Sequence, residues 1–151
     1  MTLFARSTNI ILLLVLLTAC TAIDNTCPVT EPEWLLAPDD PTVNNPPAHG
    51  YYFVNEDQSI WASAGWTDSE YSKFSEMEDG VKVGWFRPEG AELTVTGQRL
   101  DEEASSLEAD FPCCYPTRFQ ASGLYFPTEG CWEVTARAED ESLTFVVWIE
   151  P

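Results

Sequence analysis

The side chains of this 151-residue chain that are best suited to covalent chemistry are its five cysteines, Cys20, Cys27, Cys113, Cys114 and Cys131. A thiol can be alkylated, can pair in a disulfide, can bind a metal or can act as a nucleophile. No Cys-x-x-Cys pair and no Gly-x-Ser-x-Gly turn occurs, and the single histidine, His49, ends a proline-rich stretch. We therefore expect the cysteines to serve attachment and cross-linking, and we predict no metal site, no cofactor and no catalytic residue.

The first cysteine follows a segment with the pattern of an export signal. Arg6 precedes an unbroken apolar run over 10–17, and small residues lie directly before Cys20. A helix of this apolar length rises only about 12 Å, whereas the hydrocarbon layer of a membrane is roughly 30 Å thick. The segment is thus predicted to be removed after export rather than to span a membrane. The alternative is an ordinary secretory signal with a chance cysteine beside its cleavage site.

The last four residues of this segment, Leu17-Thr18-Ala19-Cys20, resemble the lipobox of bacterial lipoproteins. The resemblance implies that the thiol of Cys20 receives a diacylglyceryl group, that signal peptidase II removes residues 1–19, and that the new amine is acylated. Two or more acyl chains are needed for a lasting anchor, because one chain binds a membrane only reversibly. We expect a palmitate-bearing lipoprotein in the cell membrane or cell envelope, held outside the cytoplasm.

The other four cysteines are an even number, and disulfides persist outside the cytoplasm. Four cysteines allow three pairings. A bond between Cys113 and Cys114 would join Cα atoms about 3.8 Å apart, below the usual 4.4–6.8 Å. We predict instead that each of these two bonds to one of Cys27 and Cys131, with either arrangement open. Both arrangements would fasten Cys27 to the folded domain.

The charge of the chain excludes several classes of partner. The sequence has 25 acidic and 7 basic side chains, and removal of residues 1–19 would take away Arg6 and no acid, leaving a side-chain charge of −19. Such a chain repels nucleic-acid phosphate, so we expect no nucleic-acid partner. With 44% hydrophobic residues it is also too apolar for a disordered acidic tail, and it should fold.

The acids also allow a calcium hypothesis. Asn55, Asp57 and Ser59 have the alternating spacing of loop ligands. However, the sixth position of such a loop is Ile60 instead of glycine, and the twelfth is Trp66 instead of glutamate. The loop is therefore not an EF-hand. We interpret the remaining acid groups, at 76–79 and 139–141, as solvated turn residues.

Six tryptophans are many for a domain of this size. We expect about half of them to fill the core, as large aromatic side chains commonly do. If Trp132 faces inward, strand alternation places Trp148 on the opposite face from Phe145. Trp148 and Trp66 are therefore the candidates for an exposed aromatic patch that binds a glycan or a protein, the alternative being a covered second layer.

The proline-rich segment before residue 51 differs in composition from the rest of the chain. Six of the eleven prolines lie between Thr21 and Gly50, which predicts an extended tether over 20–50 and a folded domain over 51–151. The domain contains eight short runs typical of strands, at Tyr51–Val54, Ser59–Ser63, Val81–Phe86, Glu92–Thr96, Leu107–Phe111, Leu124–Phe126, Cys131–Arg137 and Leu143–Ile149. The last two alternate apolar and polar residues across a turn at 138–142, which predicts a hairpin with one buried face. Residues 65–80 are read as a long loop or, alternatively, a short surface helix.

The stretch GLYFPTEGCWEVTA resembles the last strands of bacterial immunoglobulin-like domains, in which a Pro-x-x-Gly turn precedes an aromatic-x-Val strand. Together with LTVTGQRLD it also resembles uncharacterised bacterial lipoproteins with such a C-terminal domain. We therefore expect an all-β fold, an immunoglobulin-like β-sandwich of about 7–8 short antiparallel strands.

These observations favour a lipid-anchored extracytoplasmic domain with a structural, adhesive or protein-binding role and no catalysis. The alternative is a carbohydrate-binding module that uses exposed aromatic side chains, with or without calcium. A hydrolase ranks third, because only the abundance of acids supports it.

Overall fold

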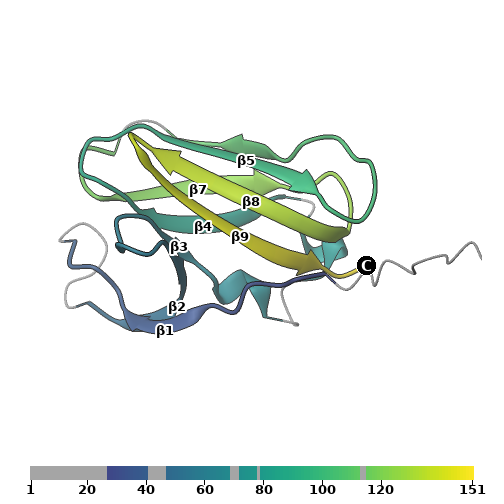
Figure 1. Cartoon of the computed structure of the whole chain (residues 1–151), viewed down its shortest axis with the longest axis horizontal. Coiled ribbons are helices and arrows are strands. Elements are labelled where there is room, and N and C mark those ends of the chain that lie inside the picture. Colours follow the sequence, from purple (N-terminus) through teal and green to yellow (C-terminus); the bar gives the residue numbers. More distant parts are fainter. Residues whose placement is uncertain (1–26, 41–46, 69–71, 78, 113–114) are drawn as a thin grey trace, which may run out of the picture.

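The structure, a computed structural model, describes residues 27–40, 47–68, 72–77, 79–112 and 115–151, and in these residues nine strands form two antiparallel sheets (Figure 1). The first sheet contains, in spatial order, β1 (Glu33–Leu36), β2 (His49–Val54), β3 (Trp61–Ser63), β4 (Val81–Phe86), β7 (Phe119–Tyr125) and β6 (Glu108–Asp110). The second sheet contains β5 (Leu93–Arg99), β8 (Gly130–Ala138) and β9 (Glu141–Ile149). Two single 3-10 turns, η1 (Gly65–Thr67) and η2 (Phe74–Glu76), lie between β3 and β4.

The two sheets enclose one main apolar core, so the predicted all-β sandwich is confirmed. All eight predicted strands are present, with ends shifted by a few residues. The finer immunoglobulin-like assignment stays a prediction. For residues 65–80 the loop was the better of the two alternatives, because the described part of this segment contains only η1 and η2.

The β8–β9 hairpin supplies much of the core. Trp132, Val134 and Phe145 are buried, as the alternation of apolar residues predicted. Ala138 pairs with Glu141, so the turn has only two residues and is tighter than predicted. Its first residue, Glu139, has a φ of 54°, in the left-handed region that such two-residue hairpin turns use.

Buried polar groups in the core have hydrogen-bond partners. The indole N–H of Trp85 donates to Ser122 Oγ at 2.8 Å, and that of Trp132 donates to the carbonyl of Thr128 at 3.0 Å. The aromatic ring of Phe53 in the first sheet stacks on Phe145 of the second, with centroids 4.2 Å apart and planes 7° apart. This stack joins the two layers where β9 lies over β2.

A smaller apolar cluster around Trp61 and Phe86 lies on the outer face of the first sheet. Next to it, Arg87 is buried and donates from its guanidinium to Gln120 Oε1 and to the carbonyl of Tyr115, at 2.8 and 2.9 Å. Burial lowers the pKa of this guanidinium below its ordinary value. The contacts hold the chain before β7 against the end of β4.

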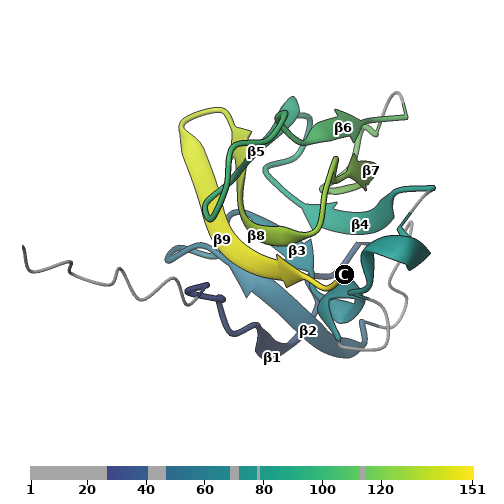
Figure 2. The same ribbon diagram turned by 90° about the vertical axis from the view of Figure 1, so that its right-hand side faces the viewer.

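The sandwich is closed on one side, where β5 lies close to β6 (Figure 2). The backbone N–H of Leu107 donates to the carbonyl of Gly97 at 3.2 Å. A Cβ atom at position 97 would lie 2.9 Å from Leu107 Cβ, so this close approach requires glycine. On the opposite side, β9 and β1 are not in comparably close contact in the described residues.

On that opposite side the chain before β1 passes from one sheet to the other. The N–H of Thr30 donates to the carbonyl of Val146 on β9 at 2.9 Å, and the N–H of Val146 donates to Thr30 Oγ1 at 2.9 Å. Glu33–Leu36 then pair with β2 in the first sheet. The predicted tether over 20–50 is therefore wrong for residues 27–36 and 49–50, because extended, proline-flanked chain also suits an edge strand.

Cys27 and Cys131 form a disulfide, with an S–S distance of 2.00 Å and Cα atoms 5.5 Å apart. The predicted pairing of these two cysteines with Cys113 and Cys114 is therefore wrong, although Cys27 is fastened to the domain as expected. The reason lies in the tertiary path: segment 27–30 runs along β9 and meets β8 there. Cys113 and Cys114, like Cys20, lie outside the described residues.

Candidate binding cleft

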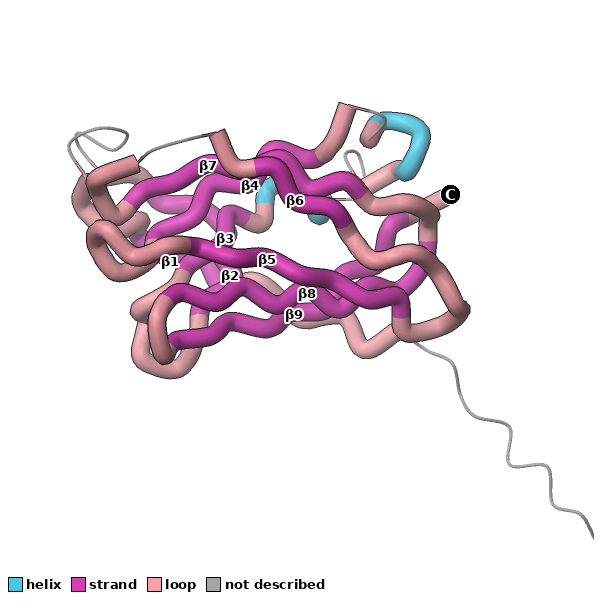
Figure 3. Tube along the Cα trace, turned by 90° about the horizontal axis from the view of Figure 1, so that it is seen from above, coloured by secondary structure: helices cyan, strands magenta, loops and turns pink. Residues whose placement is uncertain are grey.

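A cleft of about 520 Å³ lies on the open side of the sandwich, at the end where β9 finishes. Its walls come from segment 29–32, from Tyr51 and Phe53 of β2, from residues 64–68 around η1, and from residues 147–150. Figure 3 shows one of the two 3-10 turns, in cyan, at the same end of the molecule as the C-terminus, and the other nearer the middle. Its volume falls in the range of small-ligand sites, about 300–1,000 Å³.

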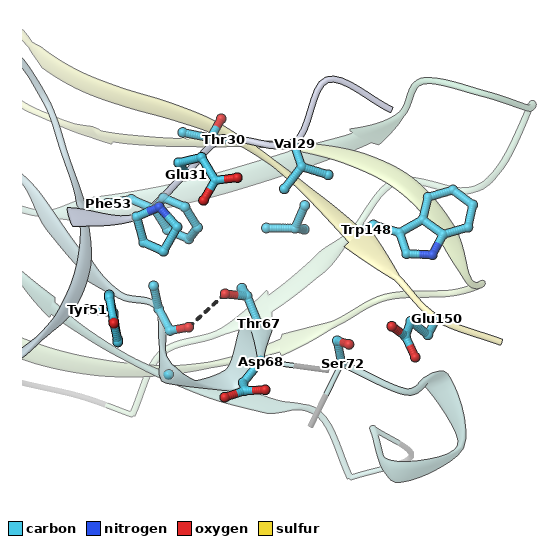
Figure 4. Close-up of a pocket in the computed structure, with 14 residues that line it drawn as sticks. Val29, Thr30, Glu31, Tyr51, Phe53, Thr67, Asp68, Ser72, Trp148 and Glu150 are labelled. Atoms are coloured by element: carbon cyan, nitrogen blue, oxygen red, sulfur yellow. Dashed lines mark hydrogen bonds between the residues drawn. The ribbon is translucent and has the colours of Figure 1, made fainter. Parts of the chain in front are cut away.

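Backbone hydrogen bonds fix the wall of the cleft that contains Asp68, Ser72 and Glu150. The N–H of Ser72 donates to the carbonyl of Asp68, and the N–H of Glu150 donates to the carbonyl of Ser72, at 3.0 and 2.9 Å. Thr67 Oγ1 donates to the carbonyl of Ala64 at 2.8 Å and so closes η1 (Figure 4). The residues after β3 are thereby held against the end of β9.

Two exposed aromatic side chains border the cleft. Tyr51 is 53% exposed and Trp148 is 41% exposed. Figure 4 shows them at opposite ends of the cleft, with Glu31 above and Asp68 below. The cleft is therefore bordered by flat apolar rings at its ends and by carboxylates between them.

Tyr51 also belongs to an exposed aromatic patch on β1 and β2, formed by Trp34, Leu36, His49 and Tyr51. Register pairs Trp34 with Tyr51 and Leu36 with His49, which places all four side chains on one face. The Trp34 ring meets Tyr51 edge-on at 4.8 Å between centroids and stacks on His49 at 6.0 Å. The aromatic patch thus continues the cleft toward the edge of the first sheet.

The charged side chains that line the cleft among the described residues are acidic. They are Glu31, Asp68 and Glu150, and no lysine, arginine or histidine of the described residues lines the cleft. Lys73 is bridged to Glu150 through the backbone. In the part of the chain that the structure describes, neither Glu31 nor Glu150 makes an ion pair with a basic side chain.

Of the two tryptophans predicted to be exposed, Trp148 is exposed and Trp66 is not. The Trp66 ring is half-buried against the core, 5.9 Å from Phe126, and its N–H donates to the carbonyl of Ser63 at 2.8 Å. The prediction for Trp66 is wrong because η1 folds the ring back onto the sandwich. Sequence reasoning missed Trp34 and Tyr51, although their alternation with half-buried Leu35 and Tyr52 was a possible signal.

The predicted calcium-loop residues form a hydrogen-bonded turn before β3. Ser59 Oγ lies 2.8 Å from Asp57 Oδ1 and 3.1 Å from Glu141 Oε2, while Asn55 Oδ1 accepts the N–H of Ile60 at 2.9 Å. Hydrogen bonds from Ser59 hold the pKa of the Asp57 carboxyl below its ordinary value. Among the described residues, no group of three or more His, Cys, Asp or Glu side chains could hold a metal ion. The side-chain oxygens of this turn thus accept hydrogen bonds from the Ser59 hydroxyl and from backbone N–H groups.

An ion pair between Arg99 and Asp101 lies beside the disulfide. Arg99 Nε donates to Asp101 Oδ1 at 2.7 Å, and the same oxygen accepts the N–H of Cys131 at 3.2 Å. The hydrogen bond from Arg99 is the main reason why the pKa of Asp101 lies below its ordinary value. These contacts fix the end of β5 against the start of β8.

None of the helical segments in the described part of the chain has the length and hydropathy needed to cross a membrane. Comparison of the whole chain with models of protein families, with curated proteins and with solved structures finds no match.

Proposed function

We propose that the protein is a lipid-anchored extracytoplasmic domain that binds another protein and catalyses no reaction. The Cys27–Cys131 disulfide carries this proposal, because disulfides form and persist outside the reducing cytoplasm. Oxidation of these thiols agrees with export through the signal segment over 1–19. The lipobox-like Leu17-Thr18-Ala19-Cys20 then supplies the anchor.

The disulfide also limits how far the domain can stand from the membrane. Only residues 21–26 separate the lipidated Cys20 from Cys27, which is bonded to β8. Six fully extended residues span about 20 Å at most. The cleft, whose wall begins at Val29, is therefore held near the membrane surface.

Anchoring is tested by labelling cells with a palmitate analogue. We expect Cys20→Ala to lose the label and to leave the mature membrane fraction, because it lacks the thiol that accepts the lipid. Thr21→Ala is the matched control and should keep both. A Cys20→Ala chain that is still labelled and still in the membrane fraction would contradict the proposal.

The protein-binding role is tested by photocrosslinking in intact cells. A benzophenone amino acid at Tyr51, beside the cleft, should give a discrete protein adduct. The control position is Thr144, an exposed residue of β9 on the outer face of the second sheet. Adducts of equal yield from both positions, or none from Tyr51, would argue against a binding role for the cleft.

The exposed Trp34–Tyr51 pair favours a second candidate, a carbohydrate-binding module. Flat aromatic side chains can stack on sugar rings. In this case a glycan array should show a ligand that raises the melting temperature, with or without calcium, because a ligand that binds the folded state stabilises it. An unchanged melting temperature across the array would remove this candidate.

A further inference from the structure

We propose that the cleft binds a lysine- or arginine-bearing extended segment of the partner protein. This inference rests on the proposed protein-binding function and names the chemistry of the partner. It is drawn from the charge, the aromatic borders and the shape of the cleft.

The charge of the cleft favours a cation. Glu31 and Glu150 line it, and neither makes an ion pair within the described residues. Since no basic side chain in the described part of the chain lines the cleft, an incoming cation would compete with none of them there. Anionic ligands would be repelled both by these carboxylates and by the charge of −18 on the chain.

The aromatic borders favour an organic cation over a bare metal ion. A guanidinium or ammonium group is attracted to the face of an exposed tryptophan or tyrosine, within about 6 Å of the ring centre. Trp148 and Tyr51 offer two such faces at the ends of the cleft (Figure 4). The described residues contain no group of three or more His, Cys, Asp or Glu side chains suited to a metal.

The floor of the cleft suits the stem of a long basic side chain. Phe53 and Val147 are buried residues that line it, and Val29 adds an exposed apolar wall. Lysine and arginine bury their methylene stems on apolar surface while the charged end stays near acceptors. The volume of about 520 Å³ holds one such side chain together with flanking backbone.

The first test uses the full-length chain in detergent and a defined peptide probe. The probe is acetyl-Gly-Arg-Gly-Lys-Gly-Arg-Gly-amide with an uncharged fluorophore. Its neutral analogue has citrulline for arginine and acetyl-lysine for lysine, which keeps the shape and removes the charge. We expect the charged peptide to bind and the neutral analogue to bind at least about tenfold more weakly. Equal binding of the two peptides would overturn the inference.

The second test separates the cleft from the overall charge. Glu31→Gln with Glu150→Gln removes two charges from the cleft. Glu139→Gln with Asp140→Asn removes two charges from the exposed β8–β9 turn, at the other end of β9 (Figure 1). We expect the first pair to weaken peptide binding about tenfold and the second pair less than about twofold. Equal losses would mean non-specific attraction and would overturn the cleft as the site.

The third test concerns the aromatic borders. Trp148→Ala should weaken the charged peptide several-fold, and Trp148→Phe should restore part of the binding, because phenylalanine keeps a ring face. Unchanged melting temperatures for all variants would show that the fold is intact. Full binding by Trp148→Ala would remove the aromatic contribution and overturn that part of the inference.

Failure of this inference can be distinguished from failure of the proposed function. If Tyr51 photocrosslinks a partner in cells but the basic peptide does not bind, only the basic character of the partner is contradicted. If the crosslink and the peptide binding are both absent, the protein-binding function itself is contradicted. Binding of an oligosaccharide in place of the peptide would overturn both and favour the carbohydrate-binding candidate.

Discussion

The inner face of the first sheet shows two opposite environments within one strand. Phe53 of β2 is 3% exposed and stacks on Phe145, whereas Tyr51, two residues earlier on the same face, is 53% exposed. Trp34, opposite Tyr51 on β1, is 58% exposed. The difference arises because, in the described residues, the first sheet has six strands and the second only three. Burial here depends on how far the opposing sheet extends, and the uncovered remainder borders the proposed binding cleft.

The two regions also differ in how their charges are arranged. Beside the disulfide, at the end of β5, Asp101 forms an ion pair with Arg99 and accepts the backbone N–H of Cys131. In the cleft, the described structure shows no basic partner for Glu31 or Glu150. Paired carboxylates stabilise the fold, whereas unpaired ones are available to a ligand.

The largest expected effect on stability comes from the buried core between the two sheets. Phe145→Ala should lower the free energy of unfolding by about 4 kcal/mol, because it removes a buried ring and leaves a cavity beside Phe53. Urea denaturation measures the loss. The neighbouring exposed Thr144→Ala should cost less than about 1 kcal/mol. Similar losses at the two positions would contradict the assignment of Phe145 to the buried face of β9 and Thr144 to its exposed face.

The disulfide holds segment 27–30, which lies along β9 between the buried core and the cleft. Cys27→Ser with Cys131→Ser should lower the free energy of unfolding by about 3 kcal/mol, because the bond closes a long loop with a sequence separation of 104. Hydrogen exchange at the Val146 amide, which donates to Thr30, should quicken as well. A double variant as stable as the native chain would show that packing alone fixes this segment.

Part of the acid dependence of stability should come from the Arg99–Asp101 ion pair beside the disulfide. Because the folded pKa of Asp101 is lowered, its contribution is present above the ordinary value of about 3.9 and is lost as the pH falls through the folded value. Asp101→Asn should remove that part of the acid transition and cost about 1 kcal/mol near neutral pH. Denaturation curves measured from pH 7 to pH 2 test it.

The matched control for Asp101→Asn is Glu31→Gln in the cleft. This variant should leave the acid transition in place, because Glu31 makes no ion pair among the described residues. If Glu31→Gln changed the acid transition as much as Asp101→Asn, the charge contrast between the two regions would be wrong.

The smallest effect on stability is expected in the aromatic patch. Trp34→Ala removes a large ring, yet it should cost less than about 1 kcal/mol, because the ring is already mostly in water. The measurement is the denaturation midpoint. A loss of several kcal/mol would mean that the patch belongs to the core instead of to a binding surface.

Much of the fold followed from local patterns along the chain. Alternation placed Trp132 and Phe145 inside and Trp148 outside, because strand side chains alternate strictly between faces. The same reasoning failed for β1, because the flanking Pro32 and Pro38 made Glu33–Leu36 look like a tether. It also failed for Trp66, because a single 3-10 turn has no periodicity from which to predict its direction.

The candidate site was much less accessible to sequence reasoning. Its wall residues come from five separate parts of the described chain, so no local spacing brings them together. The pairing of Cys27 with Cys131 was missed for the same reason, because the two cysteines are 104 residues apart. Only the passage of segment 27–30 along β9 makes them neighbours.

The sequence alone determined the class of this protein: an acidic, cysteine-containing chain with an all-β pattern and an export-like N-terminus. Composition and the alternation of apolar and polar residues can be read directly along the chain. They indicate strands without knowledge of where each strand lies in the fold. Tertiary structure alone decided which cysteines are bonded and which aromatic side chains remain in water. Those outcomes depend on the unequal width of the two sheets and on the path of residues 27–32 between them, and both arise from contacts distant in sequence.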